Sequence, residues 1–203
     1  IDWNAFWEGY GSVGEEGYIV PDEEYLSILF MRKPGLPVMP VPFPDGTTRF
    51  YWNTFYRSDE DPPTRGQMDL NARSPVVWEY YDKTLTSLAS YGARIVRLDA
   101  FAYLHKEVGA SNFFNEPGTW EYLSRLAAIA ERFDVALLPE IHSRYDEGIH
   151  AKLAARGYPI YDFFFPPLVI DAIETHRVDV LASWIEEIIE GGYTTINTLG
   201  CHD

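Results

Sequence analysis

Apolar residues along this chain follow a helix–strand rhythm from about residue 73 onward. They recur every three or four positions in several stretches, which predicts amphipathic helices. Short runs rich in β-branched residues separate these stretches and predict strands. The predicted helices cover residues 74–92, 117–133, 146–156 and 179–190, with a short helical piece near 168–175. The predicted strands cover residues 94–98, 135–141, 160–165 and 193–199, the third being closed by Pro166-Pro167.

The first 72 residues lack this helical rhythm. Proline- and glycine-rich runs at 33–37 and 40–46 cannot form the interior of a helix. The dipeptide Asp45-Gly46 separates two extended, partly alternating runs at 36–43 and 48–54, a pattern typical of a β-hairpin. We therefore predict an irregular loop domain with short strands over residues 1–72, inserted into a fold whose remainder is residues 73–203.

Four strands that alternate with helices predict an α/β fold with parallel pairing and right-handed crossovers. An open, doubly wound sheet is the main alternative, but it normally carries a glycine-rich first turn, and Ala100-Phe101-Ala102-Tyr103 is unlike one. We predict part of a TIM (β/α)8 barrel, about strands four to seven. Because four strands are half of a barrel, we expect a segment of a longer polypeptide.

Charge and composition narrow the possible ligands. The net charge of −15 disfavours nucleic acids and anionic membrane surfaces, whereas neutral sugars remain compatible with it. No apolar stretch reaches the roughly 20 residues of a membrane span. A single cysteine, Cys201, favours a reducing compartment, so we predict a cytoplasmic protein. The five histidines show no metal-ligand spacing, and we predict no metal.

Three of the predicted strands end on or near an acid: Asp99, Glu140 and Asp203. The separations are 41 and 63 residues, about one and two strand–helix units. The carboxyl ends of barrel strands converge on the active-site face, so the three acids are expected to meet there. Retaining cleavage of a glycosidic bond needs a carboxylate nucleophile and a carboxylic acid about 5 Å apart. Asp99 and Glu140 fit those two roles.

Arg97 supports this interpretation, because it lies two residues before Asp99 and would face the same side. A charge-assisted pair would keep the Asp99 carboxylate ionised, as a nucleophile requires. A strand-terminal acid taken alone is more often structural, capping the next helix or pairing with an arginine. Three acids at multiples of the unit length favour catalysis.

Three strings resemble signature regions of glycoside hydrolase family 13, the α-amylase family. They are Arg97-Leu98-Asp99-Ala100, Glu140-Ile141-His142 and His202-Asp203, which resemble the second, third and fourth regions. The strings at 32–37, 102–109 and 161–168 resemble the sucrose phosphorylase branch of that family. The first region, which ends in an Asn-His pair, is absent, so the segment alone is expected to lack part of its pocket floor.

The resemblance implies roles for nine residues. Asp99 would be the nucleophile that forms a β-glucosyl ester, Glu140 the acid and base, and Asp203 the group that stabilises the oxocarbenium-like sugar. Six further residues would bind substrate: Arg97 and His202 at the sugar, Phe55 beside the glucosyl ring, and Tyr103, His142 and Lys33 at phosphate. Phe55 could equally be core packing. Lys33 stands where the branch leads us to expect Arg, and Lys lacks the bidentate fork.

The resemblance therefore implies a retaining α-glucoside phosphorylase of the sucrose phosphorylase type. Its substrates would be a small α-glucoside and inorganic phosphate, with no other cofactor. The acceptor could be fructose, fructose 6-phosphate or glycerate, and a homo-oligomer is possible. An amylase-type hydrolase or transglycosylase with the same three acids is the first alternative. A non-catalytic sugar-binding relative is the second.

Overall fold

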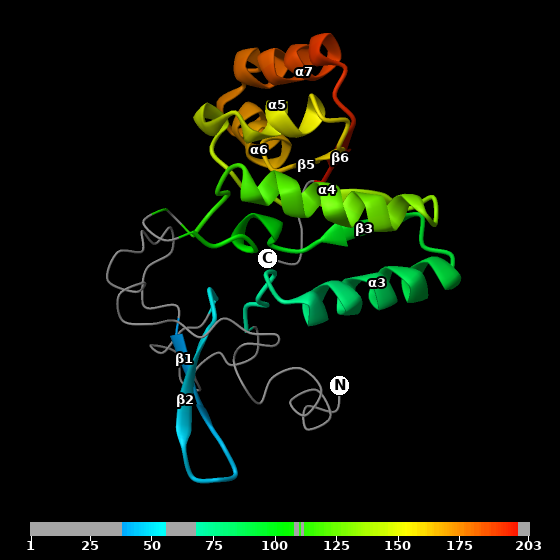
Figure 1. The fold of residues 1–203 in the computed structure, drawn as a ribbon. Coiled ribbons are helices and arrows are strands. Elements are labelled where there is room, and N and C mark those ends of the chain that lie inside the picture. The colour runs from blue at the N-terminus through cyan, green and yellow to red at the C-terminus, as the bar shows by residue number, and fades with distance from the viewer. Residues whose placement is uncertain (1–37, 56–67, 108–109, 111, 199–203) are drawn as a thin grey trace. The chain divides into compact units, whose positions relative to one another are not determined.

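The computed structural model describes residues 38–55, 68–107, 110 and 112–198 of a mixed α/β chain (Figure 1). The described residues belong to two compact units. Unit 1 takes its described residues from Ile1–Gly92 and Ala102–Phe133, and unit 2 takes its own from Ala93–Phe101 and Asp134–Asp203. None of the described helices is both long enough and apolar enough to cross a membrane.

Unit 1 contains the predicted hairpin. Strands β1 (Val38–Pro42) and β2 (Thr48–Trp52) pair antiparallel. The turn between them uses Gly46 at φ +82°, a backbone conformation that glycine adopts without strain. The Asp45 carboxylate accepts a hydrogen bond from the Thr47 backbone N–H at 2.9 Å. The hairpin prediction is confirmed, and the buried side chain of Trp52 anchors its second strand.

The described part of unit 1 also contains the helices α3 (Pro75–Ser90) and α4 (Gly118–Glu131). Both lie where the apolar periodicity predicts helices, and Pro75 occupies the start of α3, where its missing N–H costs nothing. The helices pack against each other through Trp78, whose ring lies 3.9 Å from the Arg125 guanidinium carbon. The short 3₁₀ helix η1 (Phe101–Tyr103) lies in the connection between β3 and α4.

The described part of unit 2 contains two pairs of parallel strands. Strand β3 (Ile95–Leu98) pairs with β4 (Ala136–Pro139), and β5 (Ile160–Asp162) pairs with β6 (Thr195–Asn197). The parallel pairing predicted from the strand–helix alternation is confirmed for both pairs. The helices of this unit are η2 (Tyr145–Glu147), α5 (Ile149–Ala154), α6 (Phe165–Thr175) and α7 (Asp179–Gly191).

Two predicted boundaries in unit 2 are wrong. The helix predicted over 146–156 is divided into η2 and α5, because Gly148 between them has φ +62°. Pro166-Pro167 do not close a strand: β5 ends at Asp162, and the two prolines lie in the first turn of α6. Proline is suited to that turn, since the first N–H groups of a helix have no intrahelical acceptor.

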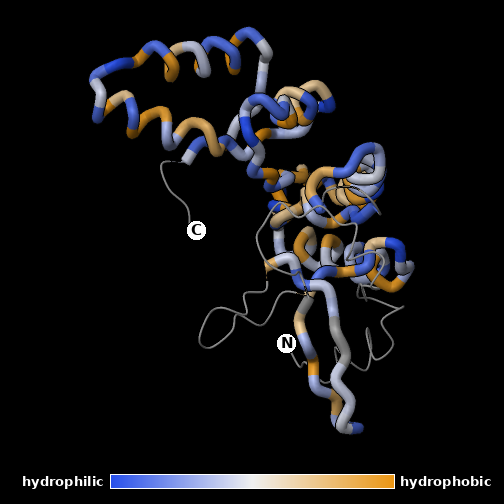
Figure 2. Tube along the Cα trace, turned by 90° about the vertical axis from the view of Figure 1, so that its left-hand side faces the viewer, coloured by the Kyte–Doolittle hydropathy of each residue, from blue (hydrophilic) through white to orange (hydrophobic). Residues whose placement is uncertain are grey.

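The described helices contain both hydrophobic and hydrophilic residues along their length, as the predicted amphipathic helices require (Figure 2).

Candidate active site

The carboxyl ends of β3 and β4 bring two of the predicted catalytic acids together. Leu98 is the register partner of Pro139, so the next residues, Asp99 and Glu140, follow side by side. The Glu140 backbone N–H donates a hydrogen bond to the Leu98 carbonyl at 2.9 Å, which extends the pairing by one step. The buried side chain of Leu138 anchors β4 in this register. Unit 2 therefore places both acids at the same end of one parallel pair.

One guanidinium contacts both acids. Arg97 Nη1 lies 2.8 Å from Asp99 Oδ1, and Arg97 Nη2 lies 2.8 Å from Glu140 Oε1. Burial acts to lower the pKa of Arg97, but the hydrogen bond to Glu140 and the charges of both acids outweigh it, so the pKa is raised. The guanidinium is therefore a fixed positive charge between two carboxylates.

The two acids differ in how firmly they are held. Glu140 has a second contact, because the Ala100 backbone N–H donates to Glu140 Oε2 at 2.9 Å. Ala100 adopts φ +46°, an uncommon conformation for a residue with a side chain. The Glu140 side chain is 12% exposed, whereas that of Asp99 is 64% exposed. Asp99 is thus the acid open to solvent, and Glu140 is the acid whose two oxygens are both engaged.

An aromatic group extends from this cluster within unit 2. The Arg97 guanidinium carbon lies 5.7 Å from the centre of the Tyr161 ring, within reach of a cation–π interaction. Tyr161 neighbours Phe163, with ring centres 4.7 Å apart. His142, which is exposed, stacks on Phe163 at 4.5 Å and 13° between the ring planes. Four predicted site residues, Arg97, Asp99, Glu140 and His142, therefore belong to one unit.

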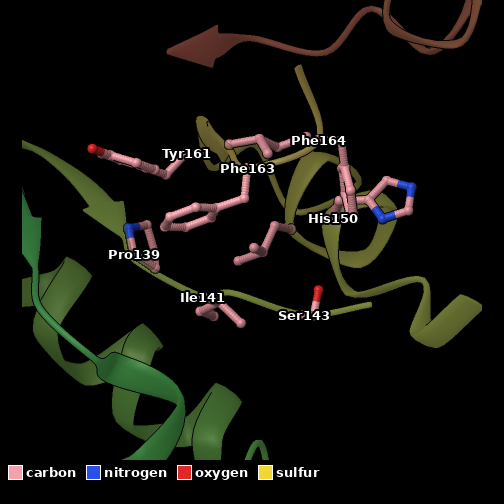
Figure 3. A pocket seen from close by; sticks show the side chains of 9 residues that line it. Pro139, Ile141, Ser143, His150, Tyr161, Phe163 and Phe164 are labelled. Carbon is pink, nitrogen blue, oxygen red and sulfur yellow. The ribbon is translucent and has the colours of Figure 1, made fainter. Parts of the chain in front are cut away.

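The cavity beside these rings is too small for a sugar. It is lined by Pro139, Ile141, Tyr161, Phe163 and other residues of unit 2 (Figure 3). It has room for about one water molecule.

Two more predicted residues lie together in unit 1. The rings of Phe55 and Tyr103 meet edge to face, with centres 5.4 Å apart and planes at 73°. Tyr103 makes a similar contact with Phe113 at 5.1 Å. The side chains of Phe55 and Tyr103 are half-buried. The structure brings this aromatic pair together from segments far apart in the sequence.

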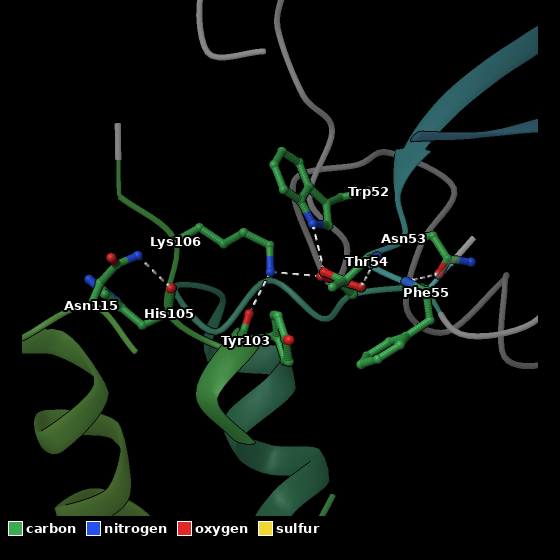
Figure 4. Close-up of polar contacts among 9 residues, drawn as sticks. Trp52, Asn53, Thr54, Phe55, Tyr103, His105, Lys106 and Asn115 are labelled. Atoms are coloured by element: carbon green, nitrogen blue, oxygen red, sulfur yellow. Dashed lines mark hydrogen bonds and ion pairs between the residues drawn. The ribbon is translucent and has the colours of Figure 1, made fainter. Parts of the chain in front are cut away.

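A buried ion pair lies beside that aromatic pair, and sequence reasoning missed it. Lys106 Nζ lies 2.7 Å from Asp69 Oδ2 and donates to the Tyr103 carbonyl at 2.5 Å (Figure 4). Burial lowers the pKa of Lys106, and the Asp69 charge opposes that shift. Lys106 stands in the string 102–109 that resembles the sucrose phosphorylase branch. A lysine is usually a solvated surface residue, and nothing in the sequence pattern around it indicates Asp69 as its partner.

The remaining predicted site residues, Lys33, His202 and Asp203, lie outside the described residues. Their roles stay predictions.

Comparison with known proteins identifies the family. Over all of its length the chain aligns, at 58% identity across 207 residues, with a sucrose 6(F)-phosphate phosphorylase of Ilumatobacter coccineus. It is 31% identical to a sucrose phosphorylase of Streptococcus mutans, with 98% of the chain aligned. This chain belongs to the sucrose phosphorylase-like branch of glycoside hydrolase family 13. It spans 40% and 37% of the lengths of these two relatives.

One solved structure agrees with membership of this branch, and a second shows the same fold. The crystal structure of a sucrose 6F-phosphate phosphorylase from Thermoanaerobacter thermosaccharolyticum superimposes with a TM-score of 0.76 at 31% identity, covering 90% of this chain and 35% of that one. A trehalulose synthase from Pseudomonas mesoacidophila shares the fold, with a TM-score of 0.57 at 19% identity over 85% of this chain and 34% of that one. No family model matches the chain.

Proposed function

We propose that the protein is a retaining α-glucoside phosphorylase, which transfers a glucosyl group from sucrose, sucrose 6F-phosphate or a related α-glucoside to inorganic phosphate. The observation that carries this proposal is the 58% identity, along the whole chain, with a sucrose 6(F)-phosphate phosphorylase. The Arg97 fork that holds two acids at the ends of neighbouring strands supports it, because retaining chemistry needs two carboxyl groups close together. Sucrose 6F-phosphate is the first substrate to test.

In the first step, the exposed Asp99 carboxylate attacks the anomeric carbon while Glu140 gives a proton to the glycosidic oxygen. The carbon–oxygen bond to the leaving sugar breaks, and a β-glucosyl ester forms on Asp99. In the second step, an oxygen of hydrogen phosphate attacks the same carbon, the ester bond to Asp99 breaks, and Glu140 takes the proton of that phosphate. Two inversions retain the α configuration, so the product is α-glucose 1-phosphate.

Arg97 and Ala100 hold the two acids in place for this cycle. Arg97 Nη1 lies 2.8 Å from Asp99 Oδ1, and Asp99 attacks as the carboxylate. Glu140 must carry a proton in the first step, while its two oxygens contact Arg97 and the Ala100 N–H. Each carboxyl oxygen has a second lone pair, so one oxygen of Glu140 can carry the proton that goes to the leaving group.

The remaining assignments belong to the same proposal. Asp203 would stabilise the oxocarbenium-like sugar, and His202 would contact it together with Arg97. Phe55 would flank the glucosyl ring, while Tyr103, His142 and Lys33 would seat the phosphate. In a chain of net charge −15, a local cluster of donors has to overcome the overall field to hold an anion.

The architecture proposed for this function is a catalytic barrel. Strands β3 to β6 would be about the fourth to seventh of a TIM (β/α)8 barrel, with residues 1–72 as an inserted loop domain and 73–203 as the barrel part. The two parallel pairs and the strand–helix order support this arrangement. A cytoplasmic location and a homo-oligomeric state stay predictions.

The test is phosphate dependence in the full-length protein. Sucrose 6F-phosphate, sucrose and α-glucosylglycerate are each incubated with and without inorganic phosphate, and α-glucose 1-phosphate and free glucose are measured separately. We expect α-glucose 1-phosphate only when phosphate is present, with the α anomer identified by NMR. Free glucose released at the same rate with and without phosphate would replace the phosphorylase proposal with the hydrolase alternative.

A further inference from the structure

We infer that the buried ion pair between Lys106 and Asp69 positions the two aromatic side chains, Phe55 and Tyr103, that are proposed to bind substrate. Lys106 and Asp69 are thereby positioning residues for substrate binding rather than catalytic residues. This inference rests on the proposed function, because that function assigns Phe55 and Tyr103 to the substrate site. All four residues belong to unit 1.

On the Asp69 side, the carboxylate holds the residue next to Phe55. Asp69 Oδ1 accepts a hydrogen bond from the Thr54 backbone N–H at 2.9 Å, and Oδ2 accepts one from the Thr54 hydroxyl. That hydroxyl also accepts from Trp52 Nε1 at 3.1 Å, so its donor and acceptor sites are both used. The Asp69 carboxylate therefore fixes the main chain at Thr54, one residue before Phe55.

On the Lys106 side, the ammonium holds the backbone of Tyr103 itself. Lys106 Nζ donates to the Tyr103 carbonyl at 2.5 Å while it pairs with Asp69 Oδ2 at 2.7 Å. Figure 4 shows the ammonium between the Tyr103 segment and the Thr54 segment. One ion pair thus connects the main chain at both aromatic residues, whose rings meet at 5.4 Å.

The buried ion pair holds its partners at a defined distance and in a defined direction. The side chains of Lys106 and Asp69 are 6% and 12% exposed. Removing two charges from water is costly, and apolar residues of the same volume would often be as stable. The ammonium instead has a carboxylate, a carbonyl and the Trp52 ring at 5.2 Å as partners. Such a set fixes direction as well as distance, which non-directional apolar packing does not.

The test separates positioning from stability in the full-length protein. Lys106→Met, Asp69→Asn and the double variant are compared with the unchanged protein by KM for the glucosyl donor, kcat and thermal midpoint. We expect KM to rise about tenfold in each single variant and kcat to change less than about threefold, since small displacements of positioning groups weaken binding. The double variant should be no worse than either single one, because the two residues act as one unit.

Asp82→Asn is the matched control. It removes the charge of Asp82 from the solvent-exposed Arg132–Asp82 pair, which joins α3 to the residue that follows α4 in the same unit. We expect its KM to equal that of the unchanged protein. Unchanged KM in Lys106→Met and Asp69→Asn, with only a lower thermal midpoint or a smaller active fraction, would overturn the inference. Additive effects on KM in the double variant would overturn it as well.

Thr54→Val decides the question if the charge variants do not fold. It removes the hydroxyl contacts to Asp69 and to Trp52 Nε1 and should raise KM about two- to threefold, since the backbone contact to Asp69 remains. A KM equal to that of the unchanged protein would overturn the inference. Failure of the proposed function is a separate result: the unchanged protein would then make no α-glucose 1-phosphate from any of the donors.

Discussion

Two ion-pair clusters among the described residues, the first at Arg97 and the second at Lys106, are built differently. In unit 2, one guanidinium serves two carboxylates, and the Asp99 side chain is 64% exposed. In unit 1, one ammonium serves a single carboxylate, and Lys106 and Asp69 are both nearly buried. Formal charges leave the first cluster with one negative charge in excess and the second neutral. A surplus of exposed charge suits a group that must react, whereas a neutral buried pair suits a group that must stay in place.

The largest effect is expected at the exposed acid of the first cluster. Asp99→Asn in the full-length protein should lower kcat for α-glucose 1-phosphate formation by at least about 10³-fold, because it removes the proposed nucleophile. The thermal midpoint should change little, since the side chain is mostly exposed and Asn keeps its shape. Initial rates and calorimetric unfolding measure the two quantities. Turnover near the normal rate would contradict the assignment of Asp99.

Glu140→Gln is expected to have the next largest effect. Loss of the proposed general acid should lower kcat on sucrose by about 10²- to 10⁴-fold. A donor such as α-glucosyl fluoride needs no proton on its leaving group, so it should restore formation of the glucosyl ester in this variant but not in Asp99→Asn. If fluoride release is as slow in Glu140→Gln as in Asp99→Asn, Glu140 is not the acid.

The second cluster should respond in stability more than in chemistry. Lys106→Met leaves the Asp69 carboxylate buried without its cation, which typically costs about 3–5 kcal/mol. Asp82→Asn, which breaks an exposed ion pair of unit 1, should shift the thermal midpoint far less. Calorimetry on both variants provides the comparison. Equal shifts would show that burial does not distinguish the two ion pairs.

The sequence predicted the first cluster because its signal is local. Arg97 lies in one strand and Asp99 directly follows that strand, while Glu140 follows the next strand in a parallel order that the strand–helix alternation requires. The hairpin at Asp45-Gly46 was predictable for the same reason, since a turn depends on neighbouring residues. Register then places the two acids side by side without further information.

The second cluster could not be predicted in this way. Lys106 and Asp69 meet through tertiary packing, and neither residue type, in its own segment, indicates burial. The interrupted helix at Gly148 and the prolines at the start of α6 were missed because glycine and proline each fit more than one kind of boundary. Tertiary side-chain contacts determine which of the conformations compatible with the local sequence pattern is formed.

The smallest effect is expected for Gly118→Ala, which disturbs the second cluster without changing a charge. Gly118 begins α4, and a Cβ atom there would lie 2.3 Å from ring atoms of His105, the residue before Lys106. His105 is confined by Tyr122, whose ring meets it edge to face at 5.1 Å. Gly118→Ala should therefore lose about 1–3 kcal/mol to overpacking, partly offset by up to about 1 kcal/mol of helix propensity.

Adding His105→Ala to Gly118→Ala provides the control, because it removes the ring that the new methyl group would meet. Relative to His105→Ala alone, the double variant should be as stable or slightly more stable, since only the gain in helix propensity remains. The kcat of Gly118→Ala should stay within about twofold of the unchanged value, because the substitution touches neither Asp99 nor Glu140. A large loss of kcat would show that the two clusters are coupled, and their separation into a reacting group and a positioning group would then fail.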